Sequence, residues 1–253
     1  MTNPQQNQKA VLITGAGSGI GAATAKLFSE NGYFVYLLGR TEANLKKVAQ
    51  NLSSSQTLAC DLRNPAQVKS IAQQVCVNPK IQLEILVNNA GIFQRHKFAE
   101  GSDDVWMSQW ETNMMGSVRM TRELFPYFMK NNRGSIVNVS STLGLRPSSE
   151  VSAYSATKAA MVNWTHSLAL EGAPYNIRAN CICPGLVDTP IHQFHSFAQN
   201  EKEKVLDSLK NIQPLGRVGT SEEIAQSIFF LAAEHSSWTA GATLSVDGGI
   251  NVV

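Results

Sequence analysis

The sequence predicts an α/β protein with a doubly wound, parallel β-sheet of about seven strands in a single domain. Short apolar segments rich in β-branched residues alternate with segments whose apolar residues recur at helical spacing. The strand segments are apolar at consecutive positions, so helices must cover both faces of the sheet. A glycine-rich turn follows the first strand. An eightfold β/α barrel is the alternative at this length, but its phosphate-type loop comes late in the chain and it needs eight strands.

The first part of the chain predicts three strands and two helices. Residues 9–15 (KAVLITG) are apolar and end in glycine, which predicts a strand, and the apolar spacing of 20–30 predicts a helix. Residues 33–38 (YFVYLL) predict the second strand. A helix is expected over 41–52, because threonine at its start is a common cap. The third strand is expected over 56–60.

The second part of the chain continues the same alternation. A helix over 65–77 begins with proline, which is favoured in the first helical turn. A strand over 84–87 (EILV) precedes a long helical stretch over 103–131. The remaining elements are expected as strand 135–139, helix 151–171, strand 176–182 and strand 242–246.

Two segments fall outside this alternation. The polar residues 1–9 predict a flexible N-terminal tail, which leaves 10–253 as the folded domain. The strand pattern also lapses between 189 and 219, where a charged amphipathic piece follows a mixed aromatic segment. An insertion over the carboxyl edge of the sheet is expected there as a lid.

The composition excludes several classes of protein. Hydrophobic residues make up 43% of the 253 residues, and the formal net charge is only +2, so we expect a packed core and no nucleic-acid partner. No apolar run approaches the ~18 residues that cross a bilayer, and the N-terminus lacks a secretory signal pattern. We therefore expect a cytoplasmic protein without a membrane anchor. The four cysteines are scattered and have no metal-ligand spacing, so no metal site is expected.

The turn at residues 14–21 (TGAGSGIG) is a candidate anion site. It lies where the first strand turns into the first helix, and glycine lets a diphosphate approach the free N–H groups of that helix. The usual G-x-G-x-x-G frame fails when it starts at Gly15, because Ile20 occupies its last position. The frame that fits is Gly15-x-x-x-Gly19-x-Gly21.

With four further motifs in register, the chain resembles the short-chain dehydrogenase/reductase family from about residue 10 to residue 249. These motifs are, in chain order, Asn88-Asn89-Ala90-Gly91, Asn113, Ser141 thirteen residues before Tyr154-x-x-x-Lys158, and Pro184-Gly185 with Thr189 four residues beyond the glycine. The resemblance implies a Rossmann-type fold. It also implies an oxidoreductase that transfers a hydride between a nicotinamide cofactor and a small carbonyl or secondary-alcohol substrate.

The resemblance assigns the catalytic roles to four residues. Tyr154 would act as general acid or base on the substrate oxygen, Ser141 would hold that oxygen, and Asn113 would position a water that connects Lys158 to solvent. Tyr154 and Lys158 lie one helical turn apart and share a face. A free phenol ionises near pH 10, so its pKa must fall for work near neutrality, which Lys158 together with a cationic nicotinamide would supply.

The cofactor contacts are expected along the carboxyl edge of the sheet. Apart from Arg40, the resemblance assigns them to Gly15, Ser18, Gly19, Ile20, Gly21, Asp61, Leu62, Asn88, Ala90, Gly91, Tyr154, Lys158, Pro184, Gly185, Val187 and Thr189. Asp61 matches the adenine-binding acid of the family, and the alternative for it is the N-cap of the next helix.

The end of the second strand favours NADP(H), with NAD(H) as the alternative. An acid there would bind the ribose 2′-hydroxyl of NAD, but the strand ends with Gly39 and Arg40, whose planar guanidinium suits a 2′-phosphate. Ser18 stands where many NADP-preferring relatives carry a second basic residue, and a plain surface charge is the alternative for Arg40.

Two rival functions and one assembly are also considered. The resemblance extends to 3-oxoacyl-acyl-carrier-protein reductases, which dock an acidic carrier through basic residues; the aligned positions here are Asn132 and Tyr175, with Lys130 and Arg133 nearby. A non-catalytic dinucleotide-sensing regulator is the rival from another class. The resemblance also implies a homo-oligomer, most simply a tetramer, formed through the helical stretches 103–131 and 151–171.

Overall fold

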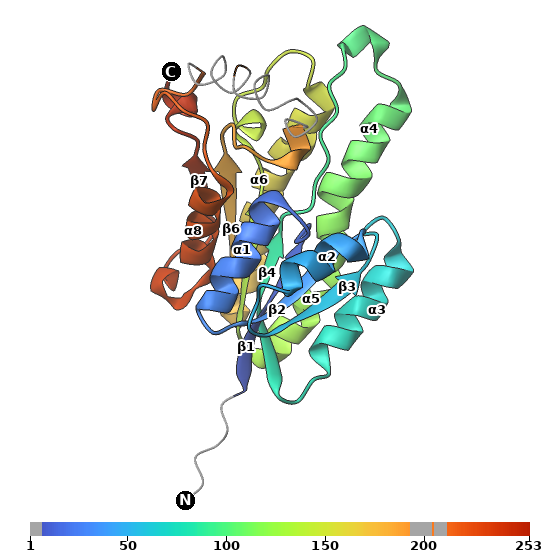
Figure 1. Cartoon of the computed structure of the whole chain (residues 1–253), viewed down its shortest axis with the longest axis vertical. Coiled ribbons are helices and arrows are strands. Elements are labelled where there is room, and N and C mark those ends of the chain that lie inside the picture. Colours follow the sequence, from blue (N-terminus) through green and yellow to red (C-terminus); the bar gives the residue numbers. More distant parts are fainter. Residues whose placement is uncertain (1–6, 193–203, 205–211) are drawn as a thin grey trace, which may run out of the picture.

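The computed structural model describes residues 7–192, 204 and 212–253, and among these seven parallel strands form one sheet in the order β3-β2-β1-β4-β5-β6-β7 (Figure 1). Listed from one edge to the other, the strands are β3 (Ser55–Ala59), β2 (Phe34–Gly39), β1 (Gln8–Thr14), β4 (Ile81–Asn88), β5 (Gly134–Val139), β6 (Ile177–Pro184) and β7 (Thr243–Val246). This confirms the predicted doubly wound sheet. The chain reverses its direction of travel across the sheet between β1 and β4, which is where such sheets bind ligands.

Helices cover both faces of the sheet. One face carries α1 (Gly19–Glu30), α2 (Glu42–Ala49) and α8 (Ser221–Ala232), and the other carries α3 (Pro65–Cys76), α5 (Gly116–Asn131) and α6 (Ser152–Gly172). Alternate residues of β1 supply the two cores: Val11 packs on the first face and Leu12 on the second. The continuous apolar strands of the sequence follow from this burial on both sides.

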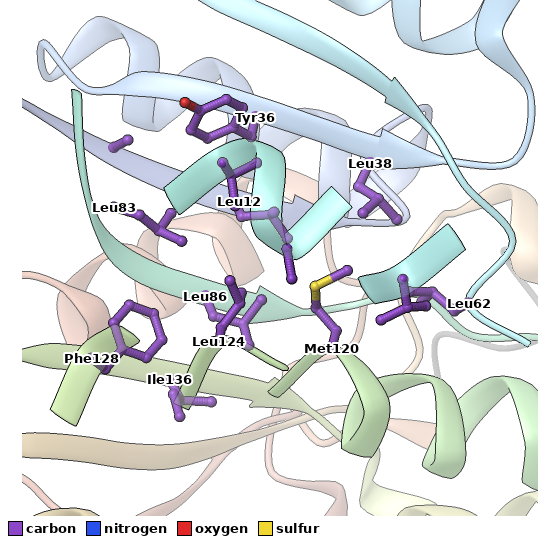
Figure 2. Packing of buried hydrophobic residues seen from close by; sticks show 14 of the residues in the cluster. Leu12, Tyr36, Leu38, Leu62, Leu83, Leu86, Met120, Leu124, Phe128 and Ile136 are labelled. Atoms are coloured by element: carbon purple, nitrogen blue, oxygen red, sulfur yellow. The ribbon is translucent and has the colours of Figure 1, made fainter. Parts of the chain in front are cut away.

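The core on the α3, α5 and α6 face is packed with large apolar side chains (Figure 2). Leu12 and Leu86 from the sheet meet Met120, Leu124 and Phe128 from α5, and all of these side chains are fully buried. Each such side chain stabilises the fold by about 1.5–3 kcal/mol through removal of its apolar surface from water. The core thus fixes α5 on the sheet.

The long helical stretch predicted over 103–131 is not one regular helix. It consists of α4 (Asp103–Gln109), a π-helical turn at Trp110–Met115 and α5. The predicted helical stretch is confirmed with its bounds. The π turn within it was not predicted, because such a turn keeps a helix-like apolar spacing while it inserts an extra residue. Figure 1 shows α4 projecting beyond the sheet edge, away from the body of α5.

The two irregular segments of the sequence are only partly described. β1 begins at Gln8, so the tail is shorter than the predicted 1–9, and residues 1–6 lie outside the described residues. Residues 193–203 and 205–211 of the expected lid also lie outside them. The two ends of that segment meet: Val187 forms a parallel bridge with Gly219, whose N–H donates to the Leu186 carbonyl at 3.0 Å.

Within the described part of the chain, none of the helices is both long enough and apolar enough to span a bilayer.

Candidate active site

The glycine-rich turn brings β1 directly against the start of α1. Gly15 and Gly19 have positive φ values of 67° and 51°, a conformation that favours glycine. A Cβ on Gly21 would lie 2.3 Å from the carbonyl oxygen of Gly15, so only glycine allows α1 to begin this close to the turn. The turn therefore leaves the backbone N–H groups at the start of α1 open to a phosphate.

Thr14 joins this turn to the end of β4. Its buried hydroxyl accepts N–H bonds from Asn89 at 2.9 Å and Ala90 at 3.0 Å, and donates to the Val87 carbonyl at 3.3 Å. The Asn89 amide in turn donates to the Thr14 carbonyl at 2.9 Å. The two loops at the reversal point of the sheet thus form one hydrogen-bonded unit.

Two adjoining cavities, of about 530 and 170 Å³, lie above the carboxyl ends of the strands. Both are lined by Gly15, Ser18, Ala90 and Gly91, so they form one elongated site. The larger cavity also holds nine of the predicted residues, namely Gly19, Ile20, Ser141, Tyr154, Lys158, Pro184, Gly185, Val187 and Thr189. The smaller cavity holds Arg40, Asp61 and Leu62. An extended dinucleotide fits this division, with its reactive end in the larger cavity and its adenosine end in the smaller one.

Tyr154, Ser141 and Lys158 come together in the larger cavity. Tyr154 is buried and shares a hydrogen bond with Ser141. The Lys158 ammonium lies 5.5 Å from the centroid of the Tyr154 ring and donates to the Val139 carbonyl at 2.8 Å. The residues of the sequence motif thus form a pair of hydroxyls, from Tyr154 and Ser141, with the Lys158 cation beside the phenol.

Burial controls the protonation of this group. It raises the pKa of Tyr154 above the ordinary 10.0, against the opposing effect of the Ser141 hydrogen bond, and it lowers the pKa of Lys158 to about 8. At neutral pH the phenol therefore keeps its proton and most of the lysine is cationic. In the protein alone, burial is the largest influence on the Tyr154 pKa. The fall in this pKa that we expect from Lys158 together with a cationic nicotinamide stays a prediction.

The backbone holds Ser141 and α6 in a fixed relation. The Ser140 hydroxyl donates to the Lys158 carbonyl at 2.7 Å. A Cβ on Gly144 would lie 2.7 Å from the carbonyl carbon of Lys158, so the short helical turn Thr142–Gly144 packs directly on the α6 backbone. The catalytic groups on these two elements form one rigid unit.

Asn113 occupies the π turn and acts on the loop after β4. Its side chain accepts the Ile92 N–H at 2.8 Å, donates to the Ile92 carbonyl at 3.0 Å and contacts the Thr157 hydroxyl at 3.3 Å. The extra residue of the π turn gives this amide its reach toward the loop. The contact that the structure supports for Asn113 is with the backbone beside Gly91, and Asn113 lines neither cavity.

Two of the predicted contact residues, Asn88 and Gly21, make structural contacts beside the cavities. Asn88 does not line either cavity: its amide donates to the Thr121 hydroxyl at 2.9 Å and to the Asn138 side-chain oxygen at 2.8 Å, which ties β4 to β5 and α5. Gly21 lies beneath the turn, where its lack of a side chain leaves room for the Gly15 carbonyl and it does not line either cavity. Both residues act on the site through the backbone they support.

The adenosine end carries one paired acid and one cation. The Asp61 carboxylate binds the Arg63 guanidinium at 2.6 Å, which holds the pKa of that carboxyl below its usual value. The N-cap of α3 is Asn64, so the alternative role proposed for Asp61 is wrong. Arg40 has no ion-pair partner within the described ranges.

The loop after β6 closes the site from the other side. Thr189 is buried, its hydroxyl donates to the Val187 carbonyl at 3.4 Å, and its methyl group would lie 3.3 Å from a Cβ on Gly19. Thr189, from the last of the predicted motifs, therefore packs on Gly19 of the first motif, the glycine-rich turn. No group of three potential metal ligands occurs among residues 7–192, 204 and 212–253.

Several lining residues escaped the sequence analysis. They come from the loops after β4 and β5, from the segment after β6 and from the C-terminal turn, and are Phe93, Arg95, Leu143, Ser148, Ser149, Val151, Pro190, Ile191, Ile212 and Ile250. Phe93 packs edge-on against the Tyr154 ring, with centroids 5.0 Å apart. No spacing signal marks them, because loop side chains have neither helical nor strand periodicity.

Together, a doubly wound sheet, a glycine cradle for a diphosphate and a buried tyrosine beside a lysine define a nicotinamide-dependent oxidoreductase. The sequence model described as enoyl-(acyl carrier protein) reductase matches residues 15–251. The chain belongs to the short-chain dehydrogenase/reductase family. It is an NAD(P)-dependent enzyme that transfers a hydride between the nicotinamide and a carbonyl or secondary-alcohol substrate.

Individual relatives are similar to this chain over nearly its whole length. A 3-oxoacyl-[acyl-carrier-protein] reductase of Thermotoga maritima is 35% identical over 246 residues, which are 96% of this chain and 97% of the relative. An NAD-dependent glycerol dehydrogenase of Listeria innocua is also 35% identical, over 96% and 94% of the two chains. The structure of ElxO with NADP bound has a TM-score of 0.90 at 29% identity and covers 98% of this chain and all of that chain.

Proposed function

We propose that this protein is an NADP(H)-dependent reductase of a small carbonyl compound, or dehydrogenase of the corresponding alcohol, with Tyr154 as its general acid/base. The observation that carries the proposal is the buried Tyr154 phenol, paired with the half-buried Ser141 hydroxyl beside Lys158, within a cavity that continues to the glycine-rich turn. A carbonyl oxygen placed between the two hydroxyls would receive a proton from Tyr154 and a hydrogen bond from Ser141.

The bound nicotinamide would supply or accept the hydride. The protein's part is to hold and move the proton: burial keeps the Tyr154 phenol protonated at neutral pH, which is the form that reduction requires. Lys158, with its pKa lowered to about 8, is mostly cationic and stabilises negative charge that develops on the phenol oxygen. Asn113 positions the loop beside Gly91 through both backbone groups of Ile92.

The preference for NADP(H) over NAD(H) is supported by the adenosine end. Arg40 lines the smaller cavity at the end of β2, where an acid would otherwise bind the ribose hydroxyl. The acid that does line this cavity, Asp61, is paired with Arg63. A 2′-phosphate would therefore meet the Arg40 guanidinium without a competing free carboxylate.

Reduction of a 3-oxoacyl group on acyl carrier protein is the second candidate, because several relatives carry that name. Docking of an acidic carrier needs free cations near the starts of β5 and β6. Arg133, one of the two nearby cations, is paired with both Glu84 and Glu234. Of these two cations, only Lys130 has no ion-pair partner among the described residues, and this favours a free small-molecule substrate.

The substitution Tyr154→Phe tests the proposal. It removes the proton donor and keeps the ring, so we expect kcat to fall by about 10²- to 10⁴-fold while the Kd for NADPH changes less than about threefold. Turnover is followed by NADPH absorbance with whichever ketone of a panel the wild type reduces. Tyr36→Phe, at a buried tyrosine in β2, is the matched control. A Tyr154→Phe enzyme with more than about a hundredth of wild-type kcat would refute the role of Tyr154.

A further inference from the structure

The substrate end of the larger cavity has an unexplained cation. Beyond the residues assigned to the dinucleotide and to proton transfer, its described walls are mostly apolar, with Phe93, Leu143, Val151, Ile191 and Ile250 among them. Among all the described residues that line this cavity, only Lys158 and Arg95 carry a charge, and both are cationic. Lys158 already donates to the Val139 carbonyl. Arg95 is therefore a cationic side chain in the wall of the substrate end that the proposed reaction does not use.

Arg95 lies on the segment that touches the catalytic tyrosine. Two residues before it, the Phe93 ring packs edge-on against the ring of Tyr154, with centroids 5.0 Å apart. Asn113 fixes the same segment one residue earlier, at Ile92. The chain thus carries the Arg95 side chain into the cavity wall a short distance along the loop from the phenol.

The Arg95 guanidinium already binds a carboxylate. Its Nη2 lies 2.9 Å from Oε2 of Glu150, and the two side chains are 67% and 41% exposed. Glu150 has a positive φ of 62° and its carbonyl accepts the His96 N–H at 2.9 Å, so the backbone holds it beside Arg95 in a conformation that glutamate seldom adopts. An ion pair this exposed contributes little stability, and its carboxylate is easily exchanged.

We propose that Arg95 is a specificity-determining residue that binds the carboxylate of an oxo-acid substrate, or of the corresponding hydroxy acid, in exchange for Glu150. The inference rests on the proposed function, since it places the substrate carbonyl at Tyr154 and Ser141. The planar guanidinium matches a carboxylate through two parallel hydrogen bonds. A substrate that covers the guanidinium also removes water from it, which makes this charge pair stronger than the exposed pair with Glu150.

Kinetics with matched acids and esters test this inference. The substrates are 3-oxobutanoate and 4-oxopentanoate, each compared with its methyl ester, and the quantity measured is the acid-to-ester ratio of kcat/KM with NADPH. We expect the wild type to prefer the acids and Arg95→Gln to lower the ratio by about 10- to 100-fold, because a charge-assisted hydrogen bond is lost. Glu150→Gln removes the competing carboxylate and is expected to raise the ratio.

The matched control is Arg122→Gln, at an exposed arginine of α5 that lines neither cavity. It is expected to leave the ratio unchanged. A wild-type enzyme that turns over the esters as well as the acids, or an Arg95→Gln variant that loses both equally, would overturn the assignment. So would stronger activity on an oxo phosphate such as dihydroxyacetone phosphate.

A binding experiment separates this inference from the proposed function. Calorimetry measures butanoate and butanamide binding to the protein saturated with NADP⁺, which needs no turnover. We expect butanoate to bind at least about tenfold more tightly than butanamide in the wild type, and equally in Arg95→Gln. Equal binding of the two ligands by the wild type contradicts the role of Arg95, whereas selective binding of butanoate without turnover of any ketone contradicts the reductase assignment alone.

Discussion

Arg40 and Arg63 lie at the same end of the site but have different environments. Arg63 neutralises the Asp61 carboxylate through a bidentate pair, whereas Arg40 lines the smaller cavity without an ion-pair partner in the described part of the chain. A guanidinium that is unpaired in the protein is ready to bind a phosphate without first breaking a bond. This difference explains why Arg40, rather than Arg63, is expected to set the choice between the two nicotinamide cofactors.

The substitution Arg40→Ala is predicted to weaken NADPH binding by about 10- to 100-fold, because the 2′-phosphate loses a charge-assisted partner. The Kd for NADH, which lacks that phosphate, is expected to change less than about threefold. Fluorescence titration with both cofactors measures the two constants. Lys47→Ala, at an exposed lysine of α2, is the control. Equal or tighter binding of NADH by the wild-type protein would refute the argument from Arg40.

The family resemblance allowed a candidate site to be predicted, and the fold brings Ser141, Tyr154 and Lys158 together in one cavity. It did not reveal Phe93 or Arg95, which lie in a loop and become neighbours of Tyr154 only through the fold. It also did not predict the raised pKa of Tyr154, since desolvation depends on burial in three dimensions. The sequence also did not predict the hydrogen bonds of Asn88 to Thr121 and Asn138, because they join elements that are distant in the chain.

At the scale of elements, the strand–turn–helix unit β1–α1 is defined by close packing of its backbone. The start of α1 leaves no room for a side chain at Gly21, and Thr14 ties the turn to the end of β4. Glycine-rich turns of this kind are recognisable in a sequence because the steric requirement excludes every other residue type. This is why the element and its ligand could both be predicted.

Gly21→Ala is predicted to disrupt this unit. The new Cβ would lie 2.3 Å from the Gly15 carbonyl oxygen, so either the turn or the helix must move. Overpacking of this kind costs about 1–3 kcal/mol, and we expect NADPH affinity to fall at least about tenfold with a Tm lower by several degrees.

Gly219→Ala is the matched control, because a Cβ there would meet no atom closer than 3.5 Å. Titration with NADPH and thermal unfolding measure the two effects. A Gly21→Ala protein with wild-type affinity and wild-type Tm would show that the turn can relax without cost.

The π turn at Trp110–Met115 is an element that could not be predicted from the sequence. Its apolar residues continue the spacing of α4 and α5, so the sequence reads as one helix over 103–131. The π turn is selected instead by contacts from outside the helix, above all the two hydrogen bonds between Asn113 and Ile92. Tertiary contacts of this kind carry no signature in the local sequence.

At the scale of the molecule, α4 and α6 still carry uncovered apolar side chains. Met114 and Met161 belong to the core, but Met107 and Trp110 are exposed and Leu170 is 78% exposed. Part of the apolar content that suggested an oligomer is therefore intramolecular, and the remainder lies on helix surfaces. An assembly of copies through these helices would cover it.

We predict that the protein is a homotetramer, with a light-scattering mass of four times the 27.5 kDa of one chain. Leu170→Lys places a charge on the exposed surface of α6 and is expected to reduce that mass. Val77→Lys is the control, because Val77 is 74% exposed at the end of α3, on neither of the two helices. A wild-type mass of a single chain at micromolar concentration would exclude this assembly.

The Thr142–Gly144 turn packs directly on the α6 backbone. This packing makes the geometry of the acid/base groups independent of the choice of substrate. The groups that move the proton are fixed by main-chain contacts, whereas Phe93, Arg95, Ile191 and Ile250 reach the same cavity from independent loops. A combinatorial library restricted to Arg95, Ile191 and Ile250, with Phe93 kept because it packs on the Tyr154 ring, can thus search for new substrates while the acid/base unit stays unchanged. One reaction centre can thus serve different substrates through changes in the surrounding loops alone.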